Sequence, residues 1–176
     1  KADYVQEKAY EPSPDNYARG VCPGVELSWQ PGAYAVDHNV YFGTSLSDVN
    51  ETADPCLDHY GSTQWTPTGL ELGTTYYWRV DEVNEANDNS PWGGDIWEFT
   101  TNDGNASEPY PTNKQTAVAT DASLYWTPGC TADSHDLYFG TDYNDVRDAT
   151  SVSHSNVVYV NRDVNNFDPG GLEEFT

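Results

Sequence analysis

Short runs of alternating apolar and polar residues dominate the chain. Leu27 and Trp29 alternate with polar neighbours, and Tyr76, Trp78 and Val80 repeat this pattern further along. A period of two predicts β-strands with one buried face. Pro and Gly residues end these runs, and no long segment has a helical period. The pattern therefore predicts an all-β chain of short strands, as in a β-sandwich.

Two short segments are expected to be single helical turns. Leu46 and Val49 are three positions apart and follow Ser45, a residue type that caps helix N-termini. Asp142, Asp145 and Asp148 are also spaced by three, which one exposed helical turn explains.

The strand pattern occurs twice, and the second copy is shorter. LSWQPG around Trp29 returns 97 residues later as LYWTPG around Trp126, and VYFGTSLSDV returns as LYFGTDYNDV. Residues 75–101 have no counterpart before Thr176. We therefore expect an N-terminal arm of residues 1–10, a first β-sandwich of residues 11–103 and a second sandwich of residues 104–176. The second sandwich is expected to lack its last two strands.

The first copy resembles a fibronectin type III module, which is an immunoglobulin-like sandwich. The resemblance rests on a strand Trp before a Pro turn, here Trp29, and on the run Leu70, Gly73, Thr74 and Tyr76. It implies that the Tyr76 hydroxyl bonds back to the chain at a corner. The longer segments VYFGTSLSDV and YYWRVDEVN resemble tandem repeats in large secreted bacterial proteins that also carry sugar-binding domains. The resemblance covers nearly all of the first copy and the second copy up to Thr176.

An incomplete sandwich has an open sheet edge and an exposed core, both unfavourable in water. A strand supplied by another chain would cover them, as in donor-strand complementation. The donor would be the arm, through Tyr4, Val5, Ala9 and Tyr10, and the acceptor would be Trp126, Leu137 and Phe139. Head-to-tail insertion of this kind does not produce a closed ring of subunits, so it would build a fibre. Alternatively, the chain is a fragment, or a shortened sandwich closes differently.

Composition narrows the class of partner. The net charge of −22 is shared by both copies and repels nucleic acid and anionic membranes. No apolar stretch is long enough to span a membrane, so no membrane insertion is expected. No motif of a hydrolase, metalloprotease or nucleotide-binding protein occurs, so we expect no enzyme activity. No cofactor is expected either, and calcium is the alternative, at Asp81, Glu82, Glu85 and Asp88.

Several features predict secretion. Asn50 and Asn105 begin sequons for N-glycosylation, and Lys1 would be a mature N-terminus. Cys22 and Cys56 lie in the first copy, so a Cys22–Cys56 disulfide is expected. Cys130 would then be unpaired, as a small buried residue or an intermolecular thiol.

These observations predict a structural subunit of an extracellular fibre or surface filament. It would be a glycoprotein that forms a homopolymer by head-to-tail insertion of its N-terminal strand into the second sandwich of a neighbour. The alternative is a spacer, adhesion or glycan-binding module of a larger secreted protein, with an extracellular polysaccharide as partner.

Overall fold

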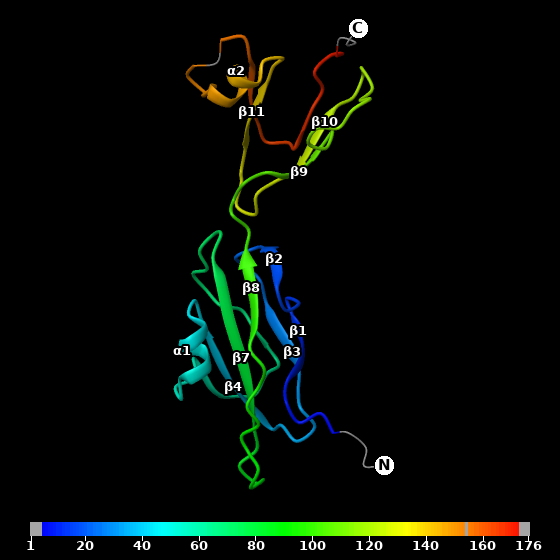
Figure 1. The fold of residues 1–176 in the computed structure, drawn as a ribbon. Coiled ribbons are helices and arrows are strands. Elements are labelled where there is room, and N and C mark those ends of the chain that lie inside the picture. Colours follow the sequence, from blue (N-terminus) through cyan, green and yellow to red (C-terminus); the bar gives the residue numbers. More distant parts are fainter. Residues whose placement is uncertain (1–4, 154, 173–176) are drawn as a thin grey trace. The chain divides into compact units, whose positions relative to one another are not determined.

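The chain folds into two compact units, Lys1–Asp103 and Gly104–Thr176. The structure is a computed structural model that describes residues 5–153 and 155–172. Apart from two helices of six residues each, the regular structure of the described residues consists of strands (Figure 1). The prediction of an all-β fold is confirmed.

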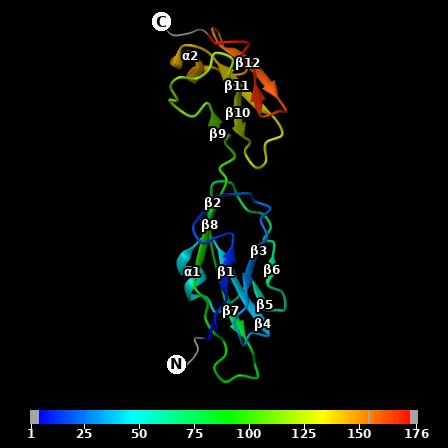
Figure 2. The ribbon, with the colours of Figure 1, turned by 90° about the vertical axis from the view of Figure 1, so that its right-hand side faces the viewer.

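The first unit contains two sheets. Its elements are β1 (Tyr10–Ser13), β2 (Ala18–Val21), β3 (Leu27–Gln30), β4 (Asp37–Gly43), α1 (Leu46–Glu51), β5 (Leu57–Tyr60), β6 (Gln64–Trp65), β7 (Thr75–Val83) and β8 (Trp97–Thr101). One sheet has the strand order β1-β3-β6, and the other has the order β2-β8-β7-β4-β5 (Figure 2). Neighbouring strands are antiparallel except β2 and β8, which are parallel.

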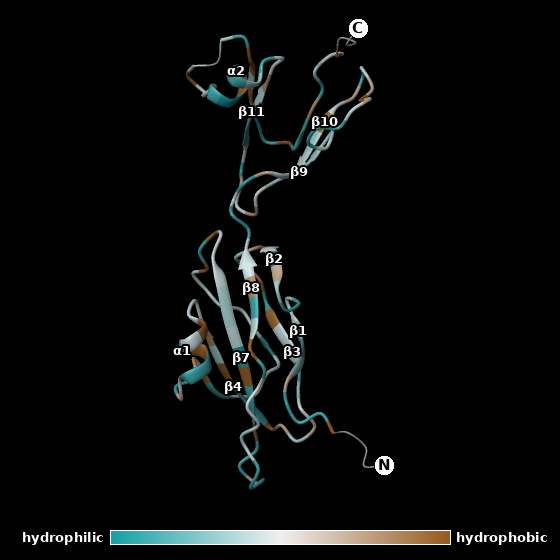
Figure 3. Cartoon of the chain, in the orientation of Figure 1, coloured by the Kyte–Doolittle hydropathy of each residue, from teal (hydrophilic) through white to brown (hydrophobic). Residues whose placement is uncertain are grey.

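Both sheets of the first unit contribute to one hydrophobic core. Its buried members are Ala9, Leu27, Trp29, Val40, Tyr76, Trp78, Val80, Trp97 and Phe99. Buried and more exposed residues alternate along β8, and hydrophobic positions are interspersed with hydrophilic ones, so that one side of the strand faces the core (Figure 3). The period of two in the sequence thus marks the buried face, and each fully buried apolar side chain contributes about 1.5–3 kcal/mol.

The short helix α1 begins where the sequence predicts. The Ser45 side chain accepts a hydrogen bond from the backbone N–H of Asp48, which confirms Ser45 as the N-cap. At the other end, the Arg79 guanidinium donates to the carbonyl oxygens of Val49 and Asn50 at 2.9 and 2.8 Å. Carbonyl groups at a helix C-terminus lack partners within the helix, so this cation holds α1 on β7.

The predicted hydrogen bond of Tyr76 is present. The backbone N–H of Glu71 donates to the Tyr76 hydroxyl at 2.9 Å, and the ring of Tyr76 stacks on Phe42 in the core. The bond ties the turn before β7 to the strand itself.

The segment before β1 packs against the first unit. Ala9 is only 2% exposed and belongs to the core, and Tyr10 pairs with Gln30 as the first residue of β1. The backbone N–H of Ala33 donates to the carbonyl of Gln6 at 2.8 Å. A Cβ atom at Gly32 would lie 2.0 Å from the Glu7 carbonyl oxygen, so this close approach requires glycine. The expectation of a separate ten-residue arm is therefore wrong for these residues.

The expected Cys22–Cys56 disulfide does not form. Cys56 is a free thiol whose Sγ donates to the Val40 carbonyl at 3.1 Å. The expectation of an unpaired Cys130 is also wrong, since Cys130 is disulfide-bonded. Cys22 follows β2 and Cys56 precedes β5, and these are the two outer strands of the five-stranded sheet. Four strand spacings of ~4.8 Å separate them, far more than the ~7 Å that a disulfide can bridge.

The second unit has the same order of elements but fewer strands. They are β9 (Ser107–Tyr110), β10 (Leu124–Thr127), β11 (His135–Phe139), α2 (Tyr143–Asp148), β12 (Val158–Arg162) and β13 (Asn166–Phe167). Strands β13, β10 and β9 form one sheet in that order, and β11 and β12 form a second sheet of two strands. The helix α2, with Asp142 as its N-cap, confirms the expected helical turn.

Backbone geometry repeats with the same spacing as the sequence. Glu11 and Glu108 both have φ of 49°, and Tyr17 and Lys114 have φ of 69° and 64°. A Cβ atom at Gly129 would lie 2.1 Å from the Gly104 carbonyl oxygen. In the first unit, a Cβ atom at Gly32 would lie 2.0 Å from the Glu7 carbonyl oxygen. The two units therefore share the same backbone conformation at these equivalent positions.

Candidate strand-acceptor groove in the second unit

The two copies differ at the strand that follows the Pro-Gly turn, which is β4 in the first unit and β11 in the second. In the first unit β4 lies between β5 and β7. In the second unit the equivalent strand, β11, pairs with β12 along one edge, and no strand of the described residues pairs with its other edge. Residues 115–118, the equivalents of β2, form no strand. In the first unit β2 pairs with β8, for which the described residues of the second unit offer no counterpart.

The open edge of β11 leaves its inner face incompletely covered. Val40 and Trp29 are 0% and 3% exposed, whereas their counterparts Leu137 and Trp126 are only partly buried. Among the described apolar residues of the second unit other than glycine, only Val157 is buried. We call the cleft between β10 and β11 the acceptor groove. It has a volume of about 400 Å³, and its lining includes Ala106, Trp126, Gly129, Ala132, His135 and Leu137.

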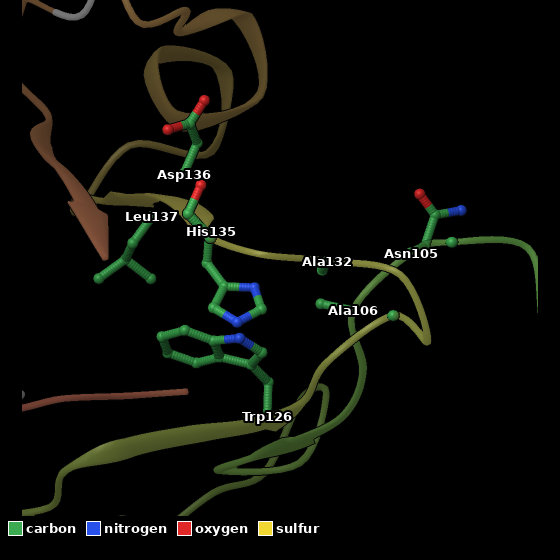
Figure 4. A pocket seen from close by; sticks show the side chains of 10 residues that line it. Asn105, Ala106, Trp126, Ala132, His135, Asp136 and Leu137 are labelled. Atoms are coloured by element: carbon green, nitrogen blue, oxygen red, sulfur yellow. The ribbon is translucent and has the colours of Figure 1, made fainter. Parts of the chain in front are cut away.

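Alternation along β11 places two kinds of side chain on its two faces. His135 lies against the ring of Trp126, whereas the carboxylate of Asp136, which also lines the groove, points away from these two rings (Figure 4). Phe139 faces the other sheet, since its ring lies 6.1 Å from that of Phe167. The expected acceptor residues Trp126, Leu137 and Phe139 therefore do lie on the inner faces of the two sheets, together with His135.

The histidine of β11 lacks the carboxylate that its counterpart has. In the first unit, Nδ1 of His38 lies 2.5 Å from Oε2 of Glu82, which comes from β7. His38 and Glu82 are 5% and 0% exposed, and Oε1 of Glu82 also accepts from the backbone N–H of Gly32 at 3.0 Å. Within the described part of the chain, the His135 side chain forms no hydrogen bond or ion pair, and its ring lies against Trp126.

The outer face of β11 is polar and aromatic. The Tyr138 and Tyr159 rings stack at 5.2 Å. The Asp136 carboxylate accepts from the Tyr159 hydroxyl at 3.0 Å and from Asn161 at 2.8 Å. The hydrogen bond to the Asp136 carboxylate raises the pKa of Tyr159, because that bond is lost when the phenol ionises. In the first unit the counterpart of Tyr138 is Tyr41, whose ring lies 4.0 Å from the Arg79 guanidinium.

The expected donor residues do not form a free strand. Tyr4 lies outside the described residues. Val5 is 43% exposed and Tyr10 is 38% exposed, but Ala9 is buried and Tyr10 is paired within the first unit. Insertion of this whole segment into another molecule would expose the core of the first unit.

The four acidic residues considered for calcium have separate surroundings. Asp81 forms an ion pair with Arg79 at 2.9 Å, and Glu82 binds His38. Glu85 is exposed and lies 3.8 Å from His59, and Asp88 is exposed. No group of three or more His, Cys, Asp or Glu side chains in the described ranges could hold a metal ion. These four side chains therefore do not gather in one group.

The role of Glu82 as a buried partner of His38 was missed at the sequence level. The signal was present, since Glu82 continues the inward positions Tyr76, Trp78 and Val80 along one strand. An acidic residue on the buried face of a strand calls for a partner, and His38 is an inward residue of a neighbouring strand.

The remaining expected features lie at the surface or in the core of the first unit. Asn50 at the end of α1 and Asn105 near the start of the second unit are both exposed. Two further tryptophans of the first unit, Trp92 and Trp97, are not among these expected features; they are 9% and 6% exposed, so neither ring is open to a sugar. In the part of the chain that the structure describes, every helix is too short and too polar to cross a membrane.

Comparison with known proteins identifies no family for this chain. No protein-family model matches it, and no curated protein matches it. Among solved structures, the chain is similar to an α-L-rhamnosidase from Dictyoglumus thermophilum, with a TM-score of 0.45 and 13% identity. The match covers 78% of this chain and 18% of the rhamnosidase chain.

Proposed function

We propose that the chain is a non-enzymatic structural subunit of an extracellular assembly. Its two units would be tandem fibronectin type III-like, immunoglobulin-like β-sandwiches. The second sandwich would be completed by a β-strand from another polypeptide chain, which binds in the acceptor groove.

The sandwich assignment is supported by the first unit. Its two sheets share one core, and the Tyr76 hydroxyl accepts a hydrogen bond from the turn that precedes its own strand. A bond of this kind is typical of the tyrosine corner in such sandwiches.

The single observation that carries the proposal is the difference between β4 and β11. β4 has a strand on each side, whereas the outer edge of β11 has no partner among the described residues. A strand-binding site has two parts, and both are present here. They are the unpaired backbone groups of the β11 edge and the partly exposed side chains of Trp126, Leu137 and Phe139. The main chain supplies hydrogen bonds, and the alternating pockets supply specificity.

The proposed donor differs from the one that the sequence suggests. Because Ala9 is buried and Tyr10 is paired in the first unit, donation of residues 1–10 would leave that unit damaged. We therefore place the donor strand elsewhere than in this segment.

Several features support an extracellular location. The chain contains disulfide-bonded cysteines, and structural disulfides persist in oxidising compartments. Both sequon asparagines, Asn50 and Asn105, are exposed and accessible to glycosylation.

Filling the groove within one molecule would test the proposal. A variant with residues 75–101 appended after Thr176 by a flexible linker would carry copies of β7 and β8 beside its own groove. We expect sedimentation velocity to show that a peptide of residues 75–101, used as a stand-in for the donor strand, binds the natural chain and does not bind the variant. The matched control carries the same appended segment with Trp78→Asp, which cannot fill the groove, and it should bind the peptide.

Two results would contradict strand binding in the groove. One is a natural chain that does not bind the peptide, which would favour the spacer or adhesion alternative. The other is an appended segment that leaves peptide binding unchanged.

A further inference from the structure

We infer the chemistry of the strand that occupies the acceptor groove: its inward residues are aromatic, then apolar, then glutamate, and the glutamate pairs with His135. This inference rests on the proposed function, because it specifies the partner of the same groove.

The first unit shows how such a site looks when it is filled. The carboxylate of Glu82 reaches from β7 into the core and binds the His38 ring with one oxygen and the Gly32 backbone with the other. A fully buried carboxylate is tolerated only with partners of this kind. The site therefore consists of a receptor half, Trp29, Gly32 and His38, and a donor half, Glu82.

The second unit keeps the receptor half. The ring centroids of Trp126 and His135 lie 5.3 Å apart at 80°, and those of Trp29 and His38 lie 5.3 Å apart at 85°. Gly129 lines the groove in the place of Gly32, with the same close backbone approach. A receptor of the same shape, with an imidazole that has no polar partner in the described residues, is suited to the same carboxylate.

The register of β4 and β7 gives the order of the inward residues. His38 is opposite Glu82, Val40 is opposite Val80, and Phe42 is opposite Trp78. Their counterparts in the groove are His135, Leu137 and Phe139. The occupant therefore runs antiparallel to β11, with an aromatic residue at Phe139, a β-branched or similar apolar residue at Leu137 and glutamate at His135.

The outer face adds two conditions. Tyr41 is opposite Arg79 in the first unit, with the guanidinium over the ring, so the occupant is expected to carry a cation opposite Tyr138. Asn39 is opposite Asp81, but the counterpart of Asn39 is Asp136. Like charges directly opposite one another are unfavourable, so the occupant should have no carboxylate at that position.

The N-terminal segment meets these conditions only in part. If Glu7 were opposite His135 in the antiparallel register, Val5 would be opposite Leu137 and Asp3 would be opposite Phe139. A carboxylate against an aromatic core residue is unfavourable.

Titration of the full chain with a peptide of residues 75–101 would test the inference by calorimetry. We expect binding, with the Glu82→Gln peptide about tenfold weaker because a charge-assisted buried bond is lost. The Asp81→Asn peptide should bind more tightly than the parent peptide. A His135→Ala chain should bind the parent peptide and the Glu82→Gln peptide equally, and NMR of the His135 ring in the natural chain should report the contact directly.

The outcomes separate this inference from the proposed function. If the natural chain bound the parent and Glu82→Gln peptides equally, or a peptide of residues 1–10 more tightly, the inference would be overturned and a strand-binding groove would remain. If the chain bound none of these peptides, both the inference and the proposed function would be overturned.

Discussion

At the scale of single residues, the first unit depends on a few polar groups at defined positions in the core. Glu82 is fully buried, and its two oxygens have the His38 ring and the Gly32 N–H as partners. The Tyr76 hydroxyl fixes a turn from inside the core. In each case the polar atom keeps a partner that replaces water, which is the condition for burying it.

Removing the buried carboxylate should strongly destabilise the first unit. Glu82→Ala leaves His38 and the Gly32 N–H without their partner, which costs about 3 kcal/mol of unfolding free energy. Urea unfolding of the full chain measures this cost. Glu85→Ala is the matched control, since the Glu85 side chain is 85% exposed, and it should change stability by less than about 0.5 kcal/mol. Equal effects of the two substitutions would contradict this role of Glu82.

Loss of the Tyr76 hydroxyl should have a smaller effect. Tyr76→Phe keeps the ring stack with Phe42 but leaves the Glu71 N–H without its acceptor, so we expect a loss of about 1 kcal/mol. The same urea unfolding measures it. Tyr77→Phe on the opposite face of β7 is the control and should be nearly neutral. A neutral Tyr76→Phe would show that the bond contributes nothing to folding.

At the scale of elements, the same strand has different surroundings in the two units. β4 is the fourth strand of a five-stranded sheet, whereas β11 is one of a pair. A strand buries its inner face only when the neighbouring strands and the facing sheet cover it. Similar sequence patterns therefore give a buried core in the first unit and an open groove in the second.

The segment before β1 should act as part of the first unit. Removing residues 1–5 should leave the thermal midpoint unchanged. Removing residues 1–10 should lower it by several degrees, because the buried Ala9 and the Tyr10–Gln30 pairing are lost. Scanning calorimetry of the two truncated chains compares them directly. Equal midpoints would mean that the whole segment is dispensable, as expected for a free arm.

At the scale of the whole molecule, the chain is strongly acidic. The net charge of −22 keeps separate copies apart at low ionic strength. Assembly through the groove should therefore strengthen as salt screens the repulsion between subunits. Sedimentation velocity at increasing salt concentration measures this, and assembly that weakens with salt would contradict it.

Thiol labelling of the whole chain checks the cysteine pattern. Under denaturing, non-reducing conditions we expect one labelled cysteine per chain, Cys56, and three after reduction. In the folded protein, burial raises the pKa of the Cys56 thiol, so less of the reactive thiolate is present at neutral pH. Labelling should be slower than for a thiol with an ordinary pKa and should accelerate as the pH rises. Labelling at Cys130 instead of Cys56 would contradict this pattern and would support the Cys22–Cys56 disulfide.

Much of the fold was readable from local patterns. The alternation around Trp29 and Trp78, the N-cap Ser45, the helical turn that contains Asp145 and Asp148, and the Tyr76 hydrogen bond all depend on residues close in sequence, and all are present in the structure. The sequence also identified Trp126, Leu137 and Phe139 as inward residues of the shorter copy. The Cys22–Cys56 disulfide and the free N-terminal arm were wrong, because both depend on which strands become neighbours.

The sequence by itself determined the all-β character, the repeat and the buried faces of the strands around Trp29 and Trp78, because side-chain alternation is a local property of the chain. Only the tertiary structure decided that β2 and β5 lie at opposite edges of one sheet, that Ala9 belongs to the core and that Glu82 meets His38. The physical reason is that strand order, disulfide pairing and the partners of buried charges depend on segments that are distant in sequence. Their proximity depends on the free energy of the whole fold.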